Sequence, residues 1–385
     1  MKRHLFRRMG RFLRPQAPSL AGAAALAALS GLLALLVPLV AGWAVEAIGT
    51  GPGAADLTAV LRCCAAGLGA AVLSAVCSYG ASAALVRGVA AKMSELGYPV
   101  RGFDAYVTST VLSGSGLSSS AAYEILVATI IDCFFGGGTL DPVERAKVGQ
   151  YAENVYFGKP CGLMDQMGSS VGGAVAIDFA DPAAPVVKKV EYDFTRSGHA
   201  LCIVDTGSCH ADLTDDYADI TREMGAVAAH FGKKFLRDVD EGAFRAALPQ
   251  LRQECGDRAV LRTMHFFEED CRAEQEAQAL EQGDFAAFLA LVDQSGLSSA
   301  LNLQNTWSAA APQQQAIPVA LAVGRELLGG SGAIRVHGGG FAGTIQAFVP
   351  NEKLETFQQG MEELLGPGMC HILHIRPQGG CVVLK

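Results

Sequence analysis

The chain lacks the features that would indicate a zinc site or a nucleic-acid-binding surface. Its eleven cysteines include no CxxC pair and no other spacing that would hold zinc, so we interpret them as reduced thiols of a cytosolic or membrane protein. Its only basic cluster flanks an apolar run, which argues against a nucleic-acid partner. Nothing in the sequence therefore points to a metal-stapled or nucleic-acid-binding domain.

Charge is distributed unevenly along the 385 residues. Half of the residues are apolar, so the chain can bury a sizeable core in two or three domains. Residues 1–96 carry nine Lys or Arg against three Asp or Glu, whereas the remainder carries 21 against 35. A basic, apolar head on an acidic body predicts two pieces that face different solvents.

The head contains two long uncharged runs. No charged residue occurs from residue 15 to 45, and about 20 apolar residues are enough to cross a bilayer. A second uncharged run covers residues 63–86 between Arg62 and Arg87. We expect two transmembrane helices here. A signal peptide is disfavoured because the apolar core is too long and a second span follows, whereas a buried helical hairpin in a soluble protein stays open.

Basic residues indicate how such a pair would be oriented. Six of them precede the first span, two follow the second, and the connecting segment carries only Glu46 and Asp56. The positive-inside rule therefore predicts an inner or plasma membrane protein with a cytoplasmic body. If the segment is a gene-model artefact, the body is cytoplasmic alone. Residues 1–92 also resemble the first two transmembrane helices of an ABC-exporter permease domain.

A glycine- and serine-rich loop begins the body. Residues 107–111 alternate β-branched and small polar side chains and predict a strand, and residues 123–134 have helical spacing. Between them stands SGSGLSSSAA, where glycines let the backbone approach a phosphate chain and the helix N-terminus donates N–H groups. There is no GK[ST], so this is not the P-loop form. The alternative is a flexible linker.

This loop and the string YAENVYFGKPCGLMDQ at residues 151–166 resemble motifs of galactokinases in the GHMP kinase family, with Leu112 in place of the family's proline. The resemblance implies ATP and Mg²⁺ as cofactors. It places Ser120 and Glu153 at the metal, makes Asp165 the catalytic base or orienting group, and puts Gly162 with Asp165 at the sugar. The implied nucleotide-binding residues are Ser113, Gly114, Ser115, Gly116, Leu117, Ser118, Ser119 and Ser120.

The C-terminal half continues the resemblance. Residues 200–204 predict a buried strand, and the following segment resembles a family stretch whose tyrosine, here Tyr217, touches the sugar; His210 is interpreted as a loop-packing residue. Residues 216–330 are predominantly helical, including 285–292 and 316–328. The string from 334 to 348 contains GxGxxG, but a strand follows it where a dinucleotide fold needs a helix. It resembles the third family motif, and residues 381–384 predict a last strand.

The resemblance implies an α+β fold: a truncated two-domain GHMP kinase body, with ribosomal-S5-like and ferredoxin-like layers, after two transmembrane helices. We expect a membrane segment at 1–92, a truncated N-terminal domain at 97–195 and a C-terminal domain at 196–385. The family's first motif, G-R-x-N-L-I-G-E-H-T-D-Y, is absent from these residues. We therefore expect an impaired galactokinase. The alternatives are a permease fragment with a non-catalytic kinase tail, or a membrane-anchored galactose or ATP sensor.

Overall fold

A computed structural model describes residues 17–48, 56–111, 117–158, 161–181, 184–207, 214–341 and 343–383. The chain divides into two compact units. Unit 1 comprises residues 1–108, 119–171 and 380–385, and unit 2 comprises residues 109–118 and 172–379. Each unit is described by itself.

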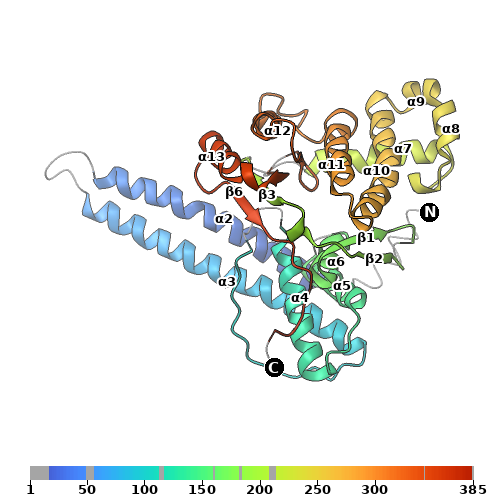
Figure 1. The fold of residues 1–385 in the computed structure, drawn as a ribbon. Coiled ribbons are helices and arrows are strands. Elements are labelled where there is room, and N and C mark those ends of the chain that lie inside the picture. Colours follow the sequence, from blue (N-terminus) through green and yellow to red (C-terminus); the bar gives the residue numbers. More distant parts are fainter. Residues whose placement is uncertain are drawn as a thin grey trace. The chain divides into compact units, whose positions relative to one another are not determined.

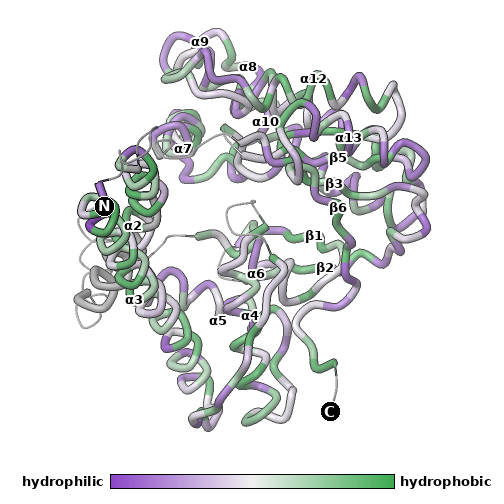
Figure 2. The backbone as a smooth tube through the Cα atoms, turned by 90° about the vertical axis from the view of Figure 1, so that its left-hand side faces the viewer, coloured by the Kyte–Doolittle hydropathy of each residue, from purple (hydrophilic) through white to green (hydrophobic). Residues whose placement is uncertain are grey.

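Unit 1 begins with a helical hairpin. Helix α2 (Ala17–Ile48) and helix α3 (Leu57–Glu95) lie side by side in both views of the chain (Figures 1 and 2). The Asp56 carboxylate caps α3 by accepting hydrogen bonds from the backbone N–H groups of Thr58 and Ala59, both at 3.0 Å. The structure therefore confirms two long helices where the sequence predicted them.

The two helices of the hairpin pack through small side chains. Gly67 lies against Val40, 3.7 Å from the position that a Cβ would take. Ser30 and Ser74 hydrogen-bond reciprocally, each hydroxyl donating to the other residue's backbone carbonyl, at 3.0 and 3.1 Å. On α3 the less exposed positions of this region recur at spacings of three and four; they are Cys63, Gly67, Ala70, Ser74 and Cys77. Such a small-residue seam lets two helices approach closely.

The last turns of α3 belong to the core of unit 1. Val89 and Met93 are fully buried, in a cluster with residues of the following helices. A Cβ on Gly88 would come within 2.9 Å of Ala152 and Tyr156, so glycine permits close contact there. The helices that complete this unit are α4 (Ser119–Ile131), η1 (Asp132–Gly136), α5 (Pro142–Tyr151), η2 (Ala152–Phe157) and α6 (Met164–Val171).

Unit 2 contains two antiparallel sheets. The hairpin of β1 (Ala174–Asp178) and β2 (Val186–Val190) is separate from a four-stranded sheet of order β4-β5-β3-β6. The strands of this larger sheet are β3 (His199–Asp205), β4 (Ala333–Val336), β5 (Thr344–Pro350) and β6 (Cys370–Leu373).

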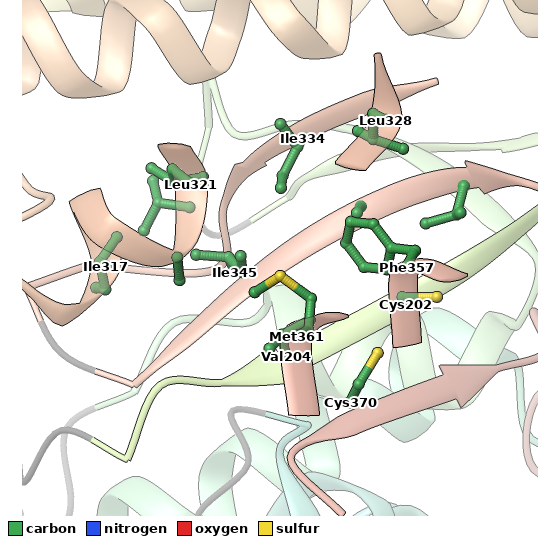
Figure 3. Close-up of a cluster of buried hydrophobic side chains, with 14 residues drawn as sticks. Cys202, Val204, Ile317, Leu321, Leu328, Ile334, Ile345, Phe357, Met361 and Cys370 are labelled. Atoms are coloured by element: carbon green, nitrogen blue, oxygen red, sulfur yellow. The ribbon is translucent and has the colours of Figure 1, made fainter. Parts of the chain in front are cut away.

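Helices cover both faces of the four-stranded sheet. Alternate residues of β5 point to opposite faces and pack against different helices. Ile345, Ala347 and Val349 belong to a cluster with α12 (Ala316–Leu328) and α13 (Leu354–Leu365), shown in Figure 3. Phe348 belongs to another cluster with α11 (Phe285–Ser298). The remaining elements are η3 (Phe194–Arg196), α7 (Thr214–His230), η4 (Leu236–Asp238), α8 (Glu241–Ala246), α9 (Leu248–Glu254), α10 (Asp257–Glu281), η5 (Ser299–Leu303) and η6 (Asn351–Lys353).

The structure confirms the predicted buried strand at 200–204, the helices at 285–292 and 316–328, and the strand that follows the glycine-rich string. Two strand predictions are wrong. Residues 107–110 have no regular secondary structure, and neither do 381–383, with Val383 79 % exposed. A strand needs a neighbour to satisfy its backbone groups. Within the described residues, neither segment is paired with a strand of the two sheets.

Candidate active site

The glycine- and serine-rich loop is described only at its end. Ser113, Gly114, Ser115 and Gly116 lie outside the described residues, whereas Leu117 and Ser118 directly precede α4 and Ser119 and Ser120 form its first turn. Ser118 adopts a left-handed backbone conformation, with φ of 50°, which is uncommon for a residue other than glycine. The chain thus turns sharply before a helix whose N-terminal N–H groups can receive an anion.

The structure brings together Ser120 and Glu153, which the resemblance assigned to the metal. The Ser120 hydroxyl donates to Glu153 Oε1 at 3.1 Å, and Glu153 lies on η2 with only 2 % of its surface exposed. Mg²⁺ commonly uses one or two protein carboxylates, with phosphate oxygens and waters as further ligands. A hydroxyl and a carboxylate at hydrogen-bond distance fit that donor set.

Two further side chains surround Glu153 that the sequence analysis did not assign to the site. The Gln166 amide donates from Nε2 to Glu153 Oε2 at 2.8 Å and to Glu124 Oε2 at 3.1 Å. Glu124 is fully buried and Gln166 is 1 % exposed. One signal was available: Glu124 is the only charged residue in the apolar run that forms α4. A buried carboxylate costs considerable free energy unless other groups stabilise it.

Cys161 borders the same network. Burial raises the pKa of its thiol to about 12, and a hydrogen bond and negative charge from Glu153 act in the same direction. A thiol with so high a pKa stays protonated and is a poor nucleophile at neutral pH. Cys161 is therefore better suited to packing than to nucleophilic attack.

Asp165 and Gln166 are neighbours on α6 but face different environments. Gln166 points into the buried network, whereas Asp165 is exposed in the first turn of the helix. Gly162, two residues before the helix, is also exposed, and a Cβ there would meet no atom within 4 Å. The exposed carboxylate is therefore accessible to a substrate, while the adjacent amide holds the buried acids.

Tyr217 lies in unit 2, on α7, against the glycine-rich turn between β4 and β5. Its hydroxyl donates to the Gly340 carbonyl at 2.7 Å, and its ring meets Phe341 edge-on. A Cβ on Gly339 would lie 2.7 Å from the Tyr217 ring. Burial, aided by the charge of Asp216, raises the pKa of Tyr217, so the phenol is neutral at physiological pH. His210 lies outside the described residues.

The same turn contains a second constrained contact. Gly340 has φ of 78°, and a Cβ there would collide with Asn305, which donates through Nδ2 to the Gly339 carbonyl at 3.1 Å. Glycine is required here both by backbone conformation and by space. The string therefore forms a turn between two antiparallel strands, as the sequence analysis predicted, and not a dinucleotide-binding loop.

Within the described residues, no group of three or more His, Cys, Asp or Glu side chains could hold a metal ion. Ser120 and Glu153 supply one hydroxyl and one carboxylate, so phosphate oxygens and water would have to complete the coordination. This arrangement suits a metal that arrives with a nucleotide.

Comparisons with known proteins agree with these observations. The GHMP kinases N terminal domain family matches residues 84–173. The chain is 32 % identical over 276 residues to a galactokinase from Streptomyces coelicolor, covering 72 % of this chain and 68 % of the relative. It is 30 % identical over 264 residues to a galactokinase from Glaesserella parasuis, covering 69 % and 66 %.

A solved structure of Lactococcus lactis galactokinase complexed with galactose is similar in fold. Its TM-score is 0.59 at 22 % identity, over 77 % of this chain and 75 % of that chain. These comparisons give no support to the predicted resemblance of residues 1–92 to an ABC-exporter permease domain. The sequence relatives, the matched family and the shared fold together show that the chain belongs to the galactokinase family of GHMP kinases.

Proposed function

We propose that this chain carries the ATP-dependent phosphotransfer core of a galactokinase. The observation that carries the proposal is the juxtaposition of Ser120 with Glu153, in a chain 32 % identical to a galactokinase, with the exposed Asp165 one residue from the Gln166 that holds Glu153. The γ-phosphoryl group would move from ATP to the C1 hydroxyl oxygen of galactose. The bond to the β-phosphate oxygen breaks, ADP leaves, and the hydroxyl proton is released.

Different residues of the chain would bind the phosphates, hold the metal and orient the acceptor. The N-terminus of α4 and the glycine–serine loop receive the phosphates through backbone N–H groups. Ser120 and Glu153 would hold Mg²⁺, which neutralises phosphate charge. Asp165 orients the acceptor hydroxyl and accepts its proton. Phosphoryl transfer requires positioning and electrostatic stabilisation more than covalent help, and these side chains provide both.

Turnover by these 385 residues should nevertheless be low. The family's first motif, G-R-x-N-L-I-G-E-H-T-D-Y, is absent from these residues. The resemblance implies that this motif supplies an arginine near the transferred phosphoryl group and contacts to galactose. Removing one preorganised group that stabilises transition-state charge typically lowers kcat by about 10²–10³-fold. We therefore expect ATP binding without galactokinase turnover at the rate of the complete relatives.

A chimera tests the assignment. Residues 1–83 would be replaced by the corresponding front of the Streptomyces coelicolor relative, and galactose-dependent ADP release compared with that of the full chain. We expect strong activity from the chimera, at least about 100-fold less from the full chain, and loss of the chimera's activity on Asp165→Asn. A folded chimera without activity would overturn the kinase assignment. Relative-like turnover by the full chain would overturn the predicted impairment.

We further propose that the α2–α3 hairpin inserts into a lipid bilayer. Within the part of the chain that the structure describes, three helices are long and apolar enough to span a membrane. Two of the candidate windows, Leu29–Ala47 and that in Leu57–Glu95, are only 6 % buried, against 44 % for the third, Ser119–Gly136. Large apolar side chains point outward on both arms of the hairpin, including Leu32 at 62 % and Leu68 at 68 % exposure. A surface of this kind is expected to contact lipid or a partner.

The dimensions of the hairpin support lipid as the partner. Residues 57–76 precede the buried part of α3 and make about 30 Å of helix, which matches the hydrocarbon thickness of a bilayer. The one charged residue in this stretch, Arg62, lies near its end, where a long basic side chain can reach the interface. The Ser30–Ser74 contact sets the register of the two helices. With that register, Trp43 and Tyr79 are separated by about 27 Å along the hairpin. They are 52 % and 78 % exposed, and aromatic side chains favour both membrane interfaces.

Alkaline extraction of membranes that contain the full chain tests this proposal. We expect the chain to stay in the membrane fraction, and a variant with Leu32, Leu36, Leu68 and Val72 all changed to Gln to be released. Release of the full chain as a monodisperse soluble protein would overturn the proposal and favour the soluble hairpin. Binding of ATP and galactose by the full chain, together with a folded chimera that shows no turnover, would favour a sensor. Co-purification with permease subunits would favour a transport role.

A further inference from the structure

Glu124 is a buried acid that the reaction described above does not use. It lies in the second turn of α4, four residues after Ser120, and none of its surface is exposed. Its Oε2 atom accepts a hydrogen bond from Gln166 Nε2 at 3.1 Å. Because the same nitrogen donates to Glu153, Glu124 is linked to the proposed metal ligand through one amide.

The amide of Gln166 has only one orientation that satisfies both acids. Its nitrogen carries two hydrogens and its oxygen carries none. In the structure both acids face the nitrogen, while Gln166 Oε1 is buried with no hydrogen-bond partner within the described residues. Rotating the amide by 180° would bring that oxygen against two carboxylates. The two acids therefore fix the orientation of the amide, and its oxygen is left without a hydrogen-bond partner within the described residues.

Helix α5 restricts the network further. A Cβ on Gly149 would come within 3.2 Å of both Gln166 Cγ and Glu124 Oε2, so the side chains are packed closely against the α5 backbone. Close packing leaves Gln166 little freedom to follow Glu153 if Glu124 is removed. Glu153 is thereby held with Oε2 on the amide and Oε1 on Ser120.

We propose that Glu124 is a positioning residue for nucleotide-bound Mg²⁺. Through Gln166 it fixes Glu153 in the orientation that directs Oε1 toward Ser120, so that the metal meets a preformed pair of oxygens. The inference rests on the proposed kinase function. Outer groups that orient metal ligands commonly change metal affinity by about 10–100-fold when mutated.

Calorimetric titration of the full chain in detergent with ATP, in the presence of Mg²⁺ and then of EDTA, tests the inference. The measured quantity is the ratio of the two dissociation constants. We expect Glu124→Ala to reduce the Mg²⁺-dependent ratio by about tenfold or more without changing ATP binding in EDTA. Glu124→Gln should recover most of the ratio, because its amide oxygen still accepts from Gln166. Glu144→Ala, an exposed acid paired with Lys147 on α5, is the matched control and should change neither constant.

A second variant separates positioning from folding. Gln166→Met keeps both acids and the volume of the side chain but removes the link. It should reduce the ratio as much as Glu124→Ala does, and the double variant should be no worse than either, since both act through one contact. A full chain whose ATP binding shows no Mg²⁺ dependence would overturn the proposed function. Mg²⁺-dependent binding that survives both Glu124→Ala and Gln166→Met would overturn the role of Glu124 alone.

Discussion

The α2–α3 hairpin and the sheet core of unit 2 place their large apolar side chains differently. In unit 2, Ile334, Ile345 and Phe357 are fully buried between the sheet and its helices (Figure 3). In the hairpin, small residues such as Gly67 form the interior, and leucines of the Leu68 type face outward. Figure 2 shows the hydrophobic colour along α2.

The difference reflects the force that drives each region to pack. Water drives the largest apolar side chains into a core, because burial is worth about 25 cal/mol per Å². That driving force vanishes between helices already in lipid, where close backbone approach and polar contacts hold the pair together. The core of unit 2 contains several Ile together with Phe and Met, whereas the hairpin helices consist largely of Ala, Leu, Gly and Val. The exposed leucines and the small interior residues of the hairpin support the lipid environment proposed for it.

The largest expected effect comes from removing a buried apolar side chain of unit 2, whereas removing an exposed one from the hairpin should change stability little. Phe357→Ala should lower the free energy of unfolding of unit 2 by about 3–5 kcal/mol, since a cavity is left in a fully buried site. Leu68→Ala should change the stability of the hairpin by less than about 0.5 kcal/mol in detergent, because the side chain is 68 % exposed.

The two tryptophans of the chain allow separate measurement, since Trp43 lies in the hairpin and Trp307 in unit 2. Phe357→Ala would be followed by Trp307 fluorescence in urea in a Trp43→Phe background, and Leu68→Ala by Trp43 in a Trp307→Phe background. Equal losses for the two substitutions would show that the hairpin has an ordinary aqueous core, and would remove the basis of the comparison.

Sequence patterns predicted helices and strands well where a segment has a single clear hydrophobic pattern. The uncharged runs predicted both hairpin helices, and the apolar segment at 200–204 predicted β3, because each is specified locally. Local sequence failed at 107–111 and at 381–383, the described part of the predicted last strand. Both segments alternate or collect β-branched residues, yet a strand forms only when another strand is available to pair with it.

From the sequence, only those candidate site residues that the family motifs assign could be predicted. The resemblance named Ser120 and Glu153, and the structure places them in contact. It could not identify the network behind them. That Gln166 joins Glu124 to Glu153 depends on the packing of α4, α5, η2 and α6, and nothing in the spacing of positions 124, 153 and 166 reveals it. Long-range polar contacts of this kind are set by tertiary structure.

An effect smaller than that of Phe357→Ala is expected for the polar contact inside the hairpin. Ser30 and Ser74 each donate to the other residue's backbone carbonyl, and their hydroxyl oxygens lie 3.2 Å apart. Interhelical hydrogen bonds in lipid contribute about 0.6 kcal/mol on average. Ser30→Ala and Ser74→Ala together should therefore lower the hairpin's unfolding free energy by about 1 kcal/mol, measured by SDS titration in mixed micelles with Trp43 as the probe. Since each single change leaves the other hydroxyl with its carbonyl acceptor, neither orphans a polar group. A loss above about 3 kcal/mol for the double variant would mean that polar contacts, and not the small-residue seam, hold the two helices together.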